Sequence, residues 1–308
     1  MKKIQSWLNK DNLVYSILAK NAYNTRSPHV NSTGFRMASL HYSEREKMDN
    51  VAETFLVNSF LKRNDPEIQT SISSYLIDDG MKMVSLTSRE DLSGYNLFDL
   101  GDSAPLDISL GDAIVRRRSV RDFTGDPVSL DSLATILRAA AGVSASAEAK
   151  LSSGELASFN LRTVPSGGGL YPIDIYIAVL DVKKLPKGIY RYQPIEDKLI
   201  EVGNNEKLQR LLVGFSGSVD MIKSSNATVV LLYVAKSWRS MRKYGNRGLR
   251  FVFQEIGGMT QNLHLAVAGL GLGSVDCASF FEDDLHKTLG LDGVYQAVIH
   301  TTLVGTIA

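Results

Sequence analysis

Apolar residues recur every three or four positions in several stretches of the chain, which predicts amphipathic helices. Residues 130–141 place leucine and alanine on one face, with Ser129 as the expected N-cap and Gly142 as the stop. The same spacing predicts further helices over residues 44–61, 67–77, 110–117, 205–213 and 283–289, and a longer core helix over about 246–269.

Other stretches have the composition of strands. Residues 173–180 and 227–235 are rich in Ile and Val, and the second is a continuous apolar run typical of a buried strand. Residues 143–161 are rich in Ser and Ala and are expected to form a mobile loop. Helices and strands are mixed and several pairings read as antiparallel, which indicates an α+β fold. The remaining expected strands are 81–86, the hairpin 188–192 and 198–202, 274–280 and 296–304.

The N-terminal third of the chain differs from the rest. Residues 1–105 are rich in Asn, Ser, Lys and Asp, and their helical segments carry no recognisable arrangement of acid, base or nucleophile. We therefore expect a largely helical N-terminal extension over residues 1–105, used for docking or for bracing a dimer, followed by a separate domain over residues 106–308.

Composition narrows the function classes. The 308 residues carry 34 Lys and Arg against 33 Asp and Glu, and this net charge of +1 excludes a bulk polyanion binder. The single cysteine, Cys277, excludes an intrachain disulfide and fits a reducing cytoplasm. The N-terminus lacks the apolar region of a signal peptide, so a cytoplasmic protein is expected. The five histidines show no metal-ligand spacing, and no metal site is expected.

A cluster of cations is the first motif with possible chemistry. Arg116, Arg117, Arg118 and Arg121 repel one another unless they form a solvated face or bind an anion. Guanidinium forks together with the hydroxyl of Ser119 suit a phosphate.

The second motif is a glycine-rich turn, Pro165-Ser166-Gly167-Gly168-Gly169. Glycines allow a backbone to approach a flat ligand closely, although an ordinary turn would explain them as well.

The third motif contains a lysine and a tyrosine in adjacent positions. Lys243, Arg247 and Arg250 are expected on one face of a helix, at its positive end, where the macrodipole disfavours them. Lys243 and Tyr244 would form a proton-transfer pair if the cation lowers the pKa of the phenol. A solvated basic turn is the alternative.

The order of these motifs resembles the nitroreductase superfamily of flavoproteins. Residues 117–123 read Arg-Arg-Ser-Val-Arg-Asp-Phe, residues 165–172 read Pro-Ser-Gly-Gly-Gly-Leu-Tyr-Pro, and Lys-Tyr-x-x-Arg-x-x-Arg follows at 243–250. The Lys-Tyr motif in this context is similar to the branch of peptide azoline dehydrogenases, the streptolysin S and microcin B17 type thiazole and oxazole oxidases. The resemblance covers about residues 106–308.

This resemblance implies a homodimer with a mostly antiparallel central sheet flanked by helices and FMN at the subunit interface. It implies that Lys243 and Tyr244 are the catalytic pair, and we assign Tyr244 as the general base and Lys243 as the group that lowers its pKa. The implied FMN-binding residues are Arg117, Arg118, Ser119, Arg121, Pro165, Ser166, Gly167, Cys277, Ala278, Ser279 and Arg250.

The implied activity is oxidation of thiazolines or oxazolines in a precursor peptide to thiazoles or oxazoles, with a cyclodehydratase complex as partner. The chain departs from the family pattern at Gly257-Gly258, where Gly-His is frequent, and at Ala278-Ser279, where two glycines are frequent. Two alternatives stay open: a general NAD(P)H-dependent nitro or quinone reductase, and a scaffold that has lost its flavin.

Overall fold

The computed structural model describes residues 55–56, 58–60, 66–80, 90–151, 153–215 and 226–308. The chain divides into two compact units, residues 1–61 and 62–308, and the elements below all belong to the second. The expected strand over 81–86 and most of the expected helix over 44–61 lie outside the described residues. The predicted domain boundary near residue 105 stays a prediction.

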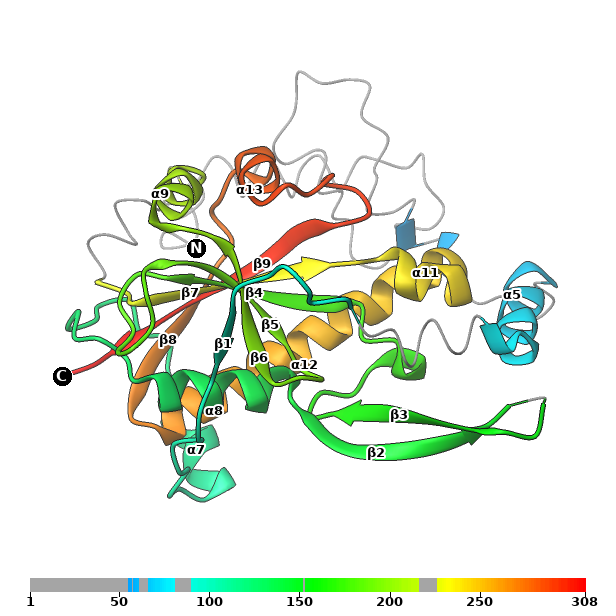
Figure 1. Cartoon of the computed structure of the whole chain (residues 1–308), viewed down its shortest axis with the longest axis horizontal. Helices are drawn as coiled ribbons and strands as arrows, with labels where there is room; N and C mark the ends of the chain where they lie inside the picture. Colours follow the sequence, from blue (N-terminus) through cyan, green and yellow to red (C-terminus); the bar gives the residue numbers. More distant parts are fainter. Residues whose placement is uncertain (1–54, 57, 61–65, 81–89, 152, 216–225) are drawn as a thin grey trace, which may run out of the picture. The chain divides into compact units, whose positions relative to one another are not determined.

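The centre of the second unit is a seven-stranded sheet in which all neighbouring strands are antiparallel (Figure 1). The strand order is β1-β6-β5-β4-β7-β9-β8. This arrangement confirms the α+β class with an antiparallel central sheet. The strands are β1 (Leu97–Asp99), β4 (Ile173–Val179), β5 (Gly188–Gln193), β6 (Lys198–Gly203), β7 (Val229–Ala235), β8 (Leu272–Cys277) and β9 (Ala297–Thr306).

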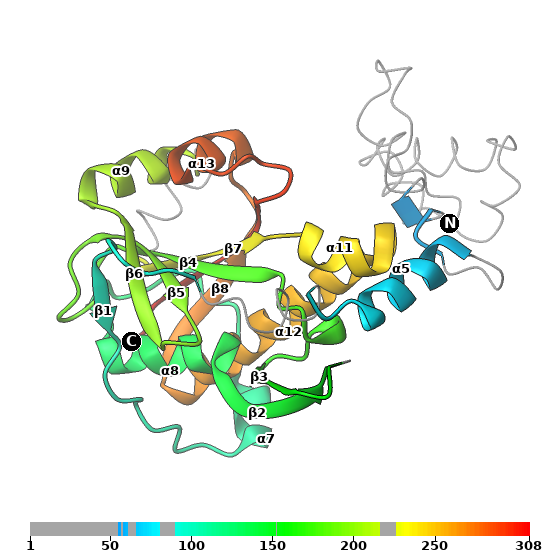
Figure 2. The ribbon, with the colours of Figure 1, turned by 45° about the vertical axis from the view of Figure 1, so that its right-hand side comes forward.

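Helices cover both faces of this sheet (Figures 1 and 2). Helices α8 (Leu130–Ala141) and α12 (Gly248–Gly269) pack together on one face, and α7 (Leu110–Arg116) packs against α12. Helices α9 (Asn205–Val213) and α13 (Glu282–Leu289) cover the other face. The sheet is therefore the middle layer of three, and both of its faces are buried.

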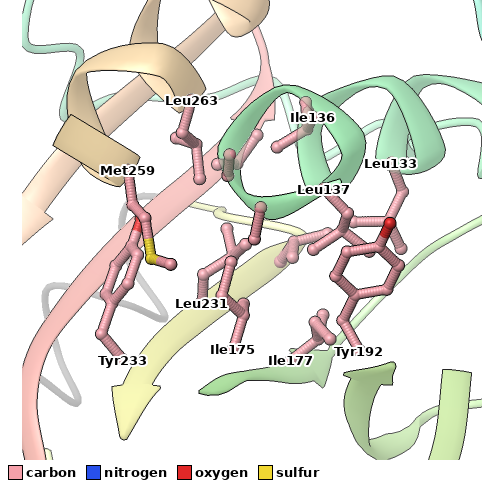
Figure 3. Close-up of a cluster of buried hydrophobic side chains, with 14 of the residues drawn as sticks. Leu133, Ile136, Leu137, Ile175, Ile177, Tyr192, Leu231, Tyr233, Met259 and Leu263 are labelled. Atoms are coloured by element: carbon pink, nitrogen blue, oxygen red, sulfur yellow. The ribbon is translucent and has the colours of Figure 1, made fainter. Parts of the chain in front are cut away.

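The two-residue period of the strands sorts their side chains between two cores. Ile175, Ile177 and Leu231 point toward α8 and α12 and pack on Leu137 and Met259 (Figure 3). The intervening residues of the same strands, such as Val230 and Leu232, pack on Leu208 and Leu211 of α9. Burial of each large aliphatic side chain contributes roughly 1.5–3 kcal/mol, so these two cores hold the three layers together.

Side-chain caps explain where two helices begin. The hydroxyl of Ser129 accepts a hydrogen bond from the amide of Ser132 at 3.0 Å, and α8 has the predicted bounds. The side-chain oxygen of Asn204 accepts from the amide of Lys207 at 3.1 Å and starts α9. Both signals were local and polar, which is why the sequence predicted these boundaries correctly.

The expectation of a mobile loop over residues 143–161 is wrong. This segment forms an antiparallel hairpin of β2 (Val143–Lys150) and β3 (Leu156–Arg162). Serine and alanine have low strand propensity, but cross-strand pairing overrides it, and Gly154 with φ of 90° closes the turn.

The expectation that Lys243, Arg247 and Arg250 share one helix face is also wrong. Helix α11 (Trp238–Tyr244) ends at Gly245, whose φ of 54° breaks the helical backbone. A short 3₁₀ turn over Gly245–Arg247 follows, and α12 begins at Gly248. Lys243 and Arg250 therefore lie on different helices.

Candidate active site

The Lys243–Tyr244 pair and the glycine-rich turn meet in the fold. The turn follows β3 and approaches the end of α11 so closely that a Cβ atom on Gly168 would lie 2.5 Å from Tyr244 Oη and 2.8 Å from Lys243 Nζ. Gly168 has a φ of 71°, a conformation that glycine adopts at little cost. The backbone of this turn therefore borders the polar ends of both side chains.

Aromatic packing against Phe251 holds Tyr244 and the glycine-rich turn in place. Phe251 of α12 makes an edge-on contact with the ring of Tyr244, with centroids 4.8 Å apart. A Cβ on Gly167 would lie 3.0 Å from the Phe251 ring, so the first glycine of the turn is in contact with the same side chain. The hydroxyl of Ser166 accepts a hydrogen bond from the amide of Tyr171 at 2.9 Å and closes the turn.

A cavity of about 670 Å³ opens beside the turn. A space of this size fits a ligand with the dimensions of a ring system and its attached chain. The hairpin, the turn, α5 (Pro66–Ile77) and α11 all contribute to its wall. Its lining residues are Tyr75, Ser144, Lys150, Phe159, Leu161, Arg162, Val164, Pro165, Ser166, Gly168, Gly169, Tyr171 and Lys243.

The pKa of Tyr244 shifts in the direction opposite to that expected from the sequence. Burial lowers the pKa of Lys243, because the ammonium loses solvation. Burial, with a smaller effect of Tyr75, raises the pKa of Tyr244. The expectation that Lys243 lowers the phenol pKa is wrong for this structure: Nζ lies 5.3 Å from the Tyr244 ring centroid, and desolvation of the phenolate dominates.

The arginine cluster lines a different cavity, of about 360 Å³. Arg116, Arg117 and Arg118 lie on its wall with His264 and Ser274. None of these guanidinium groups pairs with an acidic side chain among the residues that the structure describes. Nη1 of Arg118 donates to the carbonyls of Val115 and Arg117, which holds that side chain near the backbone.

The rest of the arginine motif is positioned by strand β8. Ser119 forms an isolated parallel bridge with Ser274, and the amide of Val120 donates to the Ser274 carbonyl at 2.9 Å. Arg121 and Ser119 are exposed and do not line the cavity. The cluster is thus an exposed cationic edge with an adjacent pocket, which is a suitable environment for a phosphate.

A polar network that is buried at His264 and Ser274 and exposed at Asp276 adjoins this pocket. His264 of α12 contacts Ser274 Oγ through Nδ1 at 2.7 Å and Asp276 Oδ1 through Nε2 at 3.1 Å. Nε2 of His300 lies 3.1 Å from the same oxygen, and the hydroxyl of Thr302 donates to it at 2.7 Å. Burial raises the pKa of Asp276, but these hydrogen bonds outweigh it and hold that pKa well below its ordinary value.

The spacing of the histidines along the chain did not predict this network. His264 and His300 come together only because α12 and β9 flank β8 in the fold. The one hint along the chain was that Asp276 directly precedes Cys277, a predicted cofactor-binding residue.

The remaining predicted residues are more dispersed. Cys277 ends β8 and is buried, whereas Ala278 and Ser279 are exposed just beyond the strand. Arg250 is half-buried on α12. These four residues line neither of the two cavities.

Comparison with known proteins supplies the family. The model of the nitroreductase family matches residues 114–305. A Methanocaldococcus jannaschii protein named as a nitroreductase is 32% identical over 183 residues, which cover 59% of this chain and 85% of that protein. The chain belongs to the nitroreductase family. Membership makes it an oxidoreductase of a class that typically binds flavin.

This nitroreductase-family chain is also similar to a peptide-processing protein. The microcin B17-processing protein McbC of Escherichia coli is 30% identical over 137 residues, covering 42% of this chain and 49% of McbC. The match fits the resemblance to the microcin B17 branch.

Solved structures show the same fold. A chain of the E. coli microcin synthetase McbBCD complex, with truncated pro-MccB17 bound, matches with a TM-score of 0.53 and 22% identity, over 86% of this chain and 99% of that one. A nitroreductase-family structure from Anabaena variabilis matches with a TM-score of 0.56 and 23% identity, over 72% of this chain and 44% of that one.

Two buried residues at or near the larger cavity were not predicted from the sequence. Glu255 of α12 is 2% exposed, close to Arg162 and Arg239, and burial raises its pKa to about 7. Tyr75 of α5 lines the larger cavity although it lies in the predicted extension. Sequence patterns could not distinguish either residue, because both lie at ordinary core-facing helix positions. Within the described part of the chain, no helix is long and apolar enough to cross a membrane.

Proposed function

We propose that this protein is an FMN-dependent dehydrogenase that oxidises thiazolines or oxazolines in a peptide to thiazoles or oxazoles. The main support is the placement of Lys243 and Tyr244 side by side against Gly168 at a cavity of about 670 Å³. A simple flavin reductase has no need for such a proton-transfer pair, in which Lys243 is buried and Tyr244 half-buried. Similarity to McbC, a microcin B17-processing protein, supports a peptide substrate.

The residues present fit FMN. Arg117 and Arg118 offer guanidinium groups without acidic partners among the described residues, which suits the phosphate. In this proposal Ser119 and Arg121 extend the phosphate site, and Pro165, Ser166 and Gly167 lie along the flavin ring. Cys277, Ala278 and Ser279 form the loop at the flavin edge, and Arg250 contacts cofactor or substrate. When bound, FMN supplies the acceptor for a hydride.

The chain's own part of the reaction is to receive a proton. Aromatisation removes a proton from the ring carbon that bears the peptide carbonyl. Since burial lowers the pKa of Lys243 and raises that of Tyr244, we assign the lysine amine as proton acceptor. The neutral phenol of Tyr244 orients the substrate by donating a hydrogen bond. This reverses the roles expected from the sequence and keeps both residues catalytic.

The two predicted halves of the FMN site line two cavities that have no residue in common. A homodimer would bring the two halves together if the arginine cluster of one protomer faces the glycine-rich turn of its partner. Two-fold symmetry then creates two equivalent composite sites.

The test uses Lys243→Ala and Tyr244→Phe. Both variants should purify with flavin, as judged by the visible absorption spectrum. Azoline-to-azole conversion, followed by the mass loss of two hydrogens, should fall on the order of 10²-fold or more, since proton transfer by a placed group contributes about 10²- to 10⁴-fold. Normal conversion by flavin-loaded variants would overturn the assignment.

A second function has one observation in its favour. The M. jannaschii relative, named as a nitroreductase, aligns over 85% of its length. A general NAD(P)H-dependent nitro or quinone reductase would bleach its flavin rapidly on addition of NADH and turn over a nitroaromatic. Under the azoline proposal NADH has little effect on the flavin spectrum.

The proposed substrate indicates which enzyme this protein works with. A peptide that already contains azolines must come from a cyclodehydratase, so we propose a complex with such an enzyme and docking through the N-terminal residues. Because α5 belongs to the second compact unit, deletion of residues 1–61 is the better test than deletion of 1–100. Unchanged association with the cyclodehydratase after that deletion would remove the docking role.

A further inference from the structure

We propose that Tyr75 of helix α5 is a positioning residue of the active site, whose ring holds the ammonium group of Lys243 after that lysine has received a proton. This inference rests on the proposed function, in which Lys243 is the proton acceptor. It assigns a role to a segment that sequence patterns gave only to docking or dimer bracing.

The geometry is that of a cation–π contact. Nζ of Lys243 lies 4.3 Å from the centroid of the Tyr75 ring and 5.3 Å from that of Tyr244. Both distances are within the roughly 6 Å over which an ammonium is attracted by an aromatic face. Tyr75 is 4% exposed and Lys243 is 8% exposed, so little water screens this contact.

The described residues of the cavity around Lys243 offer no carboxylate to stabilise its ammonium group, which leaves that role to the aromatic rings. The titratable side chains that line the same cavity are Lys150, Arg162, Tyr171 and Tyr75, and none of them is a carboxylate. On α11 itself the neighbours are Arg239, Arg242 and Tyr244. Lys243 makes no ion pair with an acid in the described part of the chain. Among the described residues, the ring faces of Tyr75 and Tyr244 are therefore the groups placed to stabilise the buried ammonium.

Hydrogen bonds hold α5 in place for this task. The hydroxyl of Ser71, one turn before Tyr75, donates to the carbonyls of Arg242 and Lys243 at 3.1 Å each. These carbonyls belong to the last turn of α11, where backbone acceptors lack helical partners. Ser71 thus links α5 to the peptide unit that carries the Lys243 side chain.

A second observation points from Tyr75 toward the ligand. The phenol oxygen of Tyr75 is buried and has no hydrogen-bond partner among the described residues. A buried hydroxyl without a partner is unfavourable, so its place in the cavity wall suits a site that a polar ligand completes.

The contact affects the two protonation states differently. The aromatic face attracts the ammonium but not the neutral amine, so it favours the state that forms when the substrate's proton reaches Nζ. An interaction made only after transfer begins raises turnover rather than substrate affinity. Tyr75 therefore makes the desolvated Lys243 a stronger base.

The experiment measures the basicity of Lys243 directly in the full-length protein. Acetic anhydride at trace concentration labels only neutral amines, and mass spectrometry of the Lys243 peptide between pH 6 and pH 11 (about one-half-unit steps) gives its titration midpoint. In Tyr75→Leu the midpoint should move to lower pH, and labelling on the acidic side of the curve should increase roughly fivefold or more. Tyr75→Phe keeps the ring and should keep the wild-type midpoint.

Controls separate basicity from access and from folding. Exposed Lys187 in the same digest is the internal reference, and Tyr95→Leu removes an exposed tyrosine outside the cavity. Greater access alone would raise the labelling plateau without moving the midpoint. If Tyr75→Leu fails to fold by circular dichroism, Tyr75→Met fills the space without an aromatic face.

Activity gives an independent readout. Flavin-loaded Tyr75→Leu should lose about tenfold in kcat with KM little changed. An unchanged Lys243 midpoint in Tyr75→Leu or Tyr75→Met overturns the inference. If instead the midpoint moves but wild-type protein oxidises no azoline, the contact stands and the proposed function fails.

Discussion

The backbone of Gly168 lies directly against the phenol oxygen of Tyr244, because a Cβ at this position would come within 2.5 Å of it. Gly168→Ala should therefore displace Tyr244 or the turn and lower azoline turnover at least tenfold, since misplacement of a catalytic group by about 1 Å costs on the order of 10²-fold. Steady-state kinetics on flavin-loaded protein measures this.

Gly94→Ala is the matched control for Gly168→Ala. Gly94 has a φ of 88° but no atom within 4 Å of the position of a Cβ, so the substitution imposes backbone strain alone. It should cost about 1 kcal/mol of stability and leave turnover unchanged. Equal turnover in the two variants would show that contact with Tyr244 is unimportant.

Arg117→Ala should weaken FMN binding and spare the fold. A guanidinium–phosphate hydrogen bond contributes about 1.5–3 kcal/mol, so its loss predicts a roughly 10- to 100-fold rise in Kd, measured by fluorescence quenching of FMN. The matched control is Arg210→Ala, because Arg210 is exposed on α9 and pairs with Glu206 of its own helix at 3.5 Å. Equal affinity in the two variants would contradict a phosphate site at Arg117.

The sequence predicted most helices and strands of the second unit because their signals were local. Ser129 and Asn204 cap α8 and α9, and the Ile- and Val-rich runs became β4 and β7. The hairpin over 143–162 escaped prediction because its strands are stabilised by each other rather than by propensity.

The site was predicted only in part, for a similar reason. The Lys243–Tyr244 motif and the glycine-rich turn could be recognised as segments, but their contact depends on how α11 packs on the turn. Tyr75 and the partners of Asp276 come from elements distant in sequence, and no spacing rule connects them. Desolvation also depends on the fold, so the direction of the Tyr244 pKa shift was not accessible from the sequence.

Glu255→Gln should stabilise the protein at alkaline pH. Burial raises the pKa of Glu255 from 4.5 to about 7, although Ser166, Arg162 and Arg239 oppose it. The unfolded chain releases the proton near pH 4.5 and the folded chain only near 7, so wild-type stability falls with rising pH in this window. Glu255→Gln cannot ionise and does not lose stability in this way. Its free energy of unfolding relative to that of wild type should therefore rise by up to about 3 kcal/mol between pH 4 and pH 8.

Urea unfolding at the two pH values measures this difference, with Glu206→Gln on the exposed face of α9 as control. A constant difference between variant and wild type would mean that Glu255 ionises as readily in the folded as in the unfolded state.

Asp276→Asn should destabilise the protein most at neutral pH. The hydrogen bonds from His264, His300 and Thr302 hold the folded pKa of Asp276 below its ordinary value of 3.8. The resulting stability is present above pH 3.8 and is lost as pH falls below it, so the Tm of the variant should approach that of wild type in acid. Exposed Asp107→Asn is the control, and a Tm difference that persists unchanged in acid would contradict the network's electrostatic role.

Two impaired variants should restore activity to each other at limiting FMN, where Arg117→Ala protein stays largely unloaded, if the composite-dimer proposal is correct. Arg117→Ala disables the phosphate half of each site, and Lys243→Ala disables the half beside the glycine-rich turn. In a heterodimer of the two chains one composite site carries both substitutions and the other carries neither. Co-expression with two affinity tags isolates this species, and it should have one working site and bind FMN there with wild-type affinity. Each homodimer purified alone is the control. A heterodimer as inactive as both parents would place the arginine cluster and the Lys243–Tyr244 pair in the same protomer's site, or would show that the active protein is not a dimer.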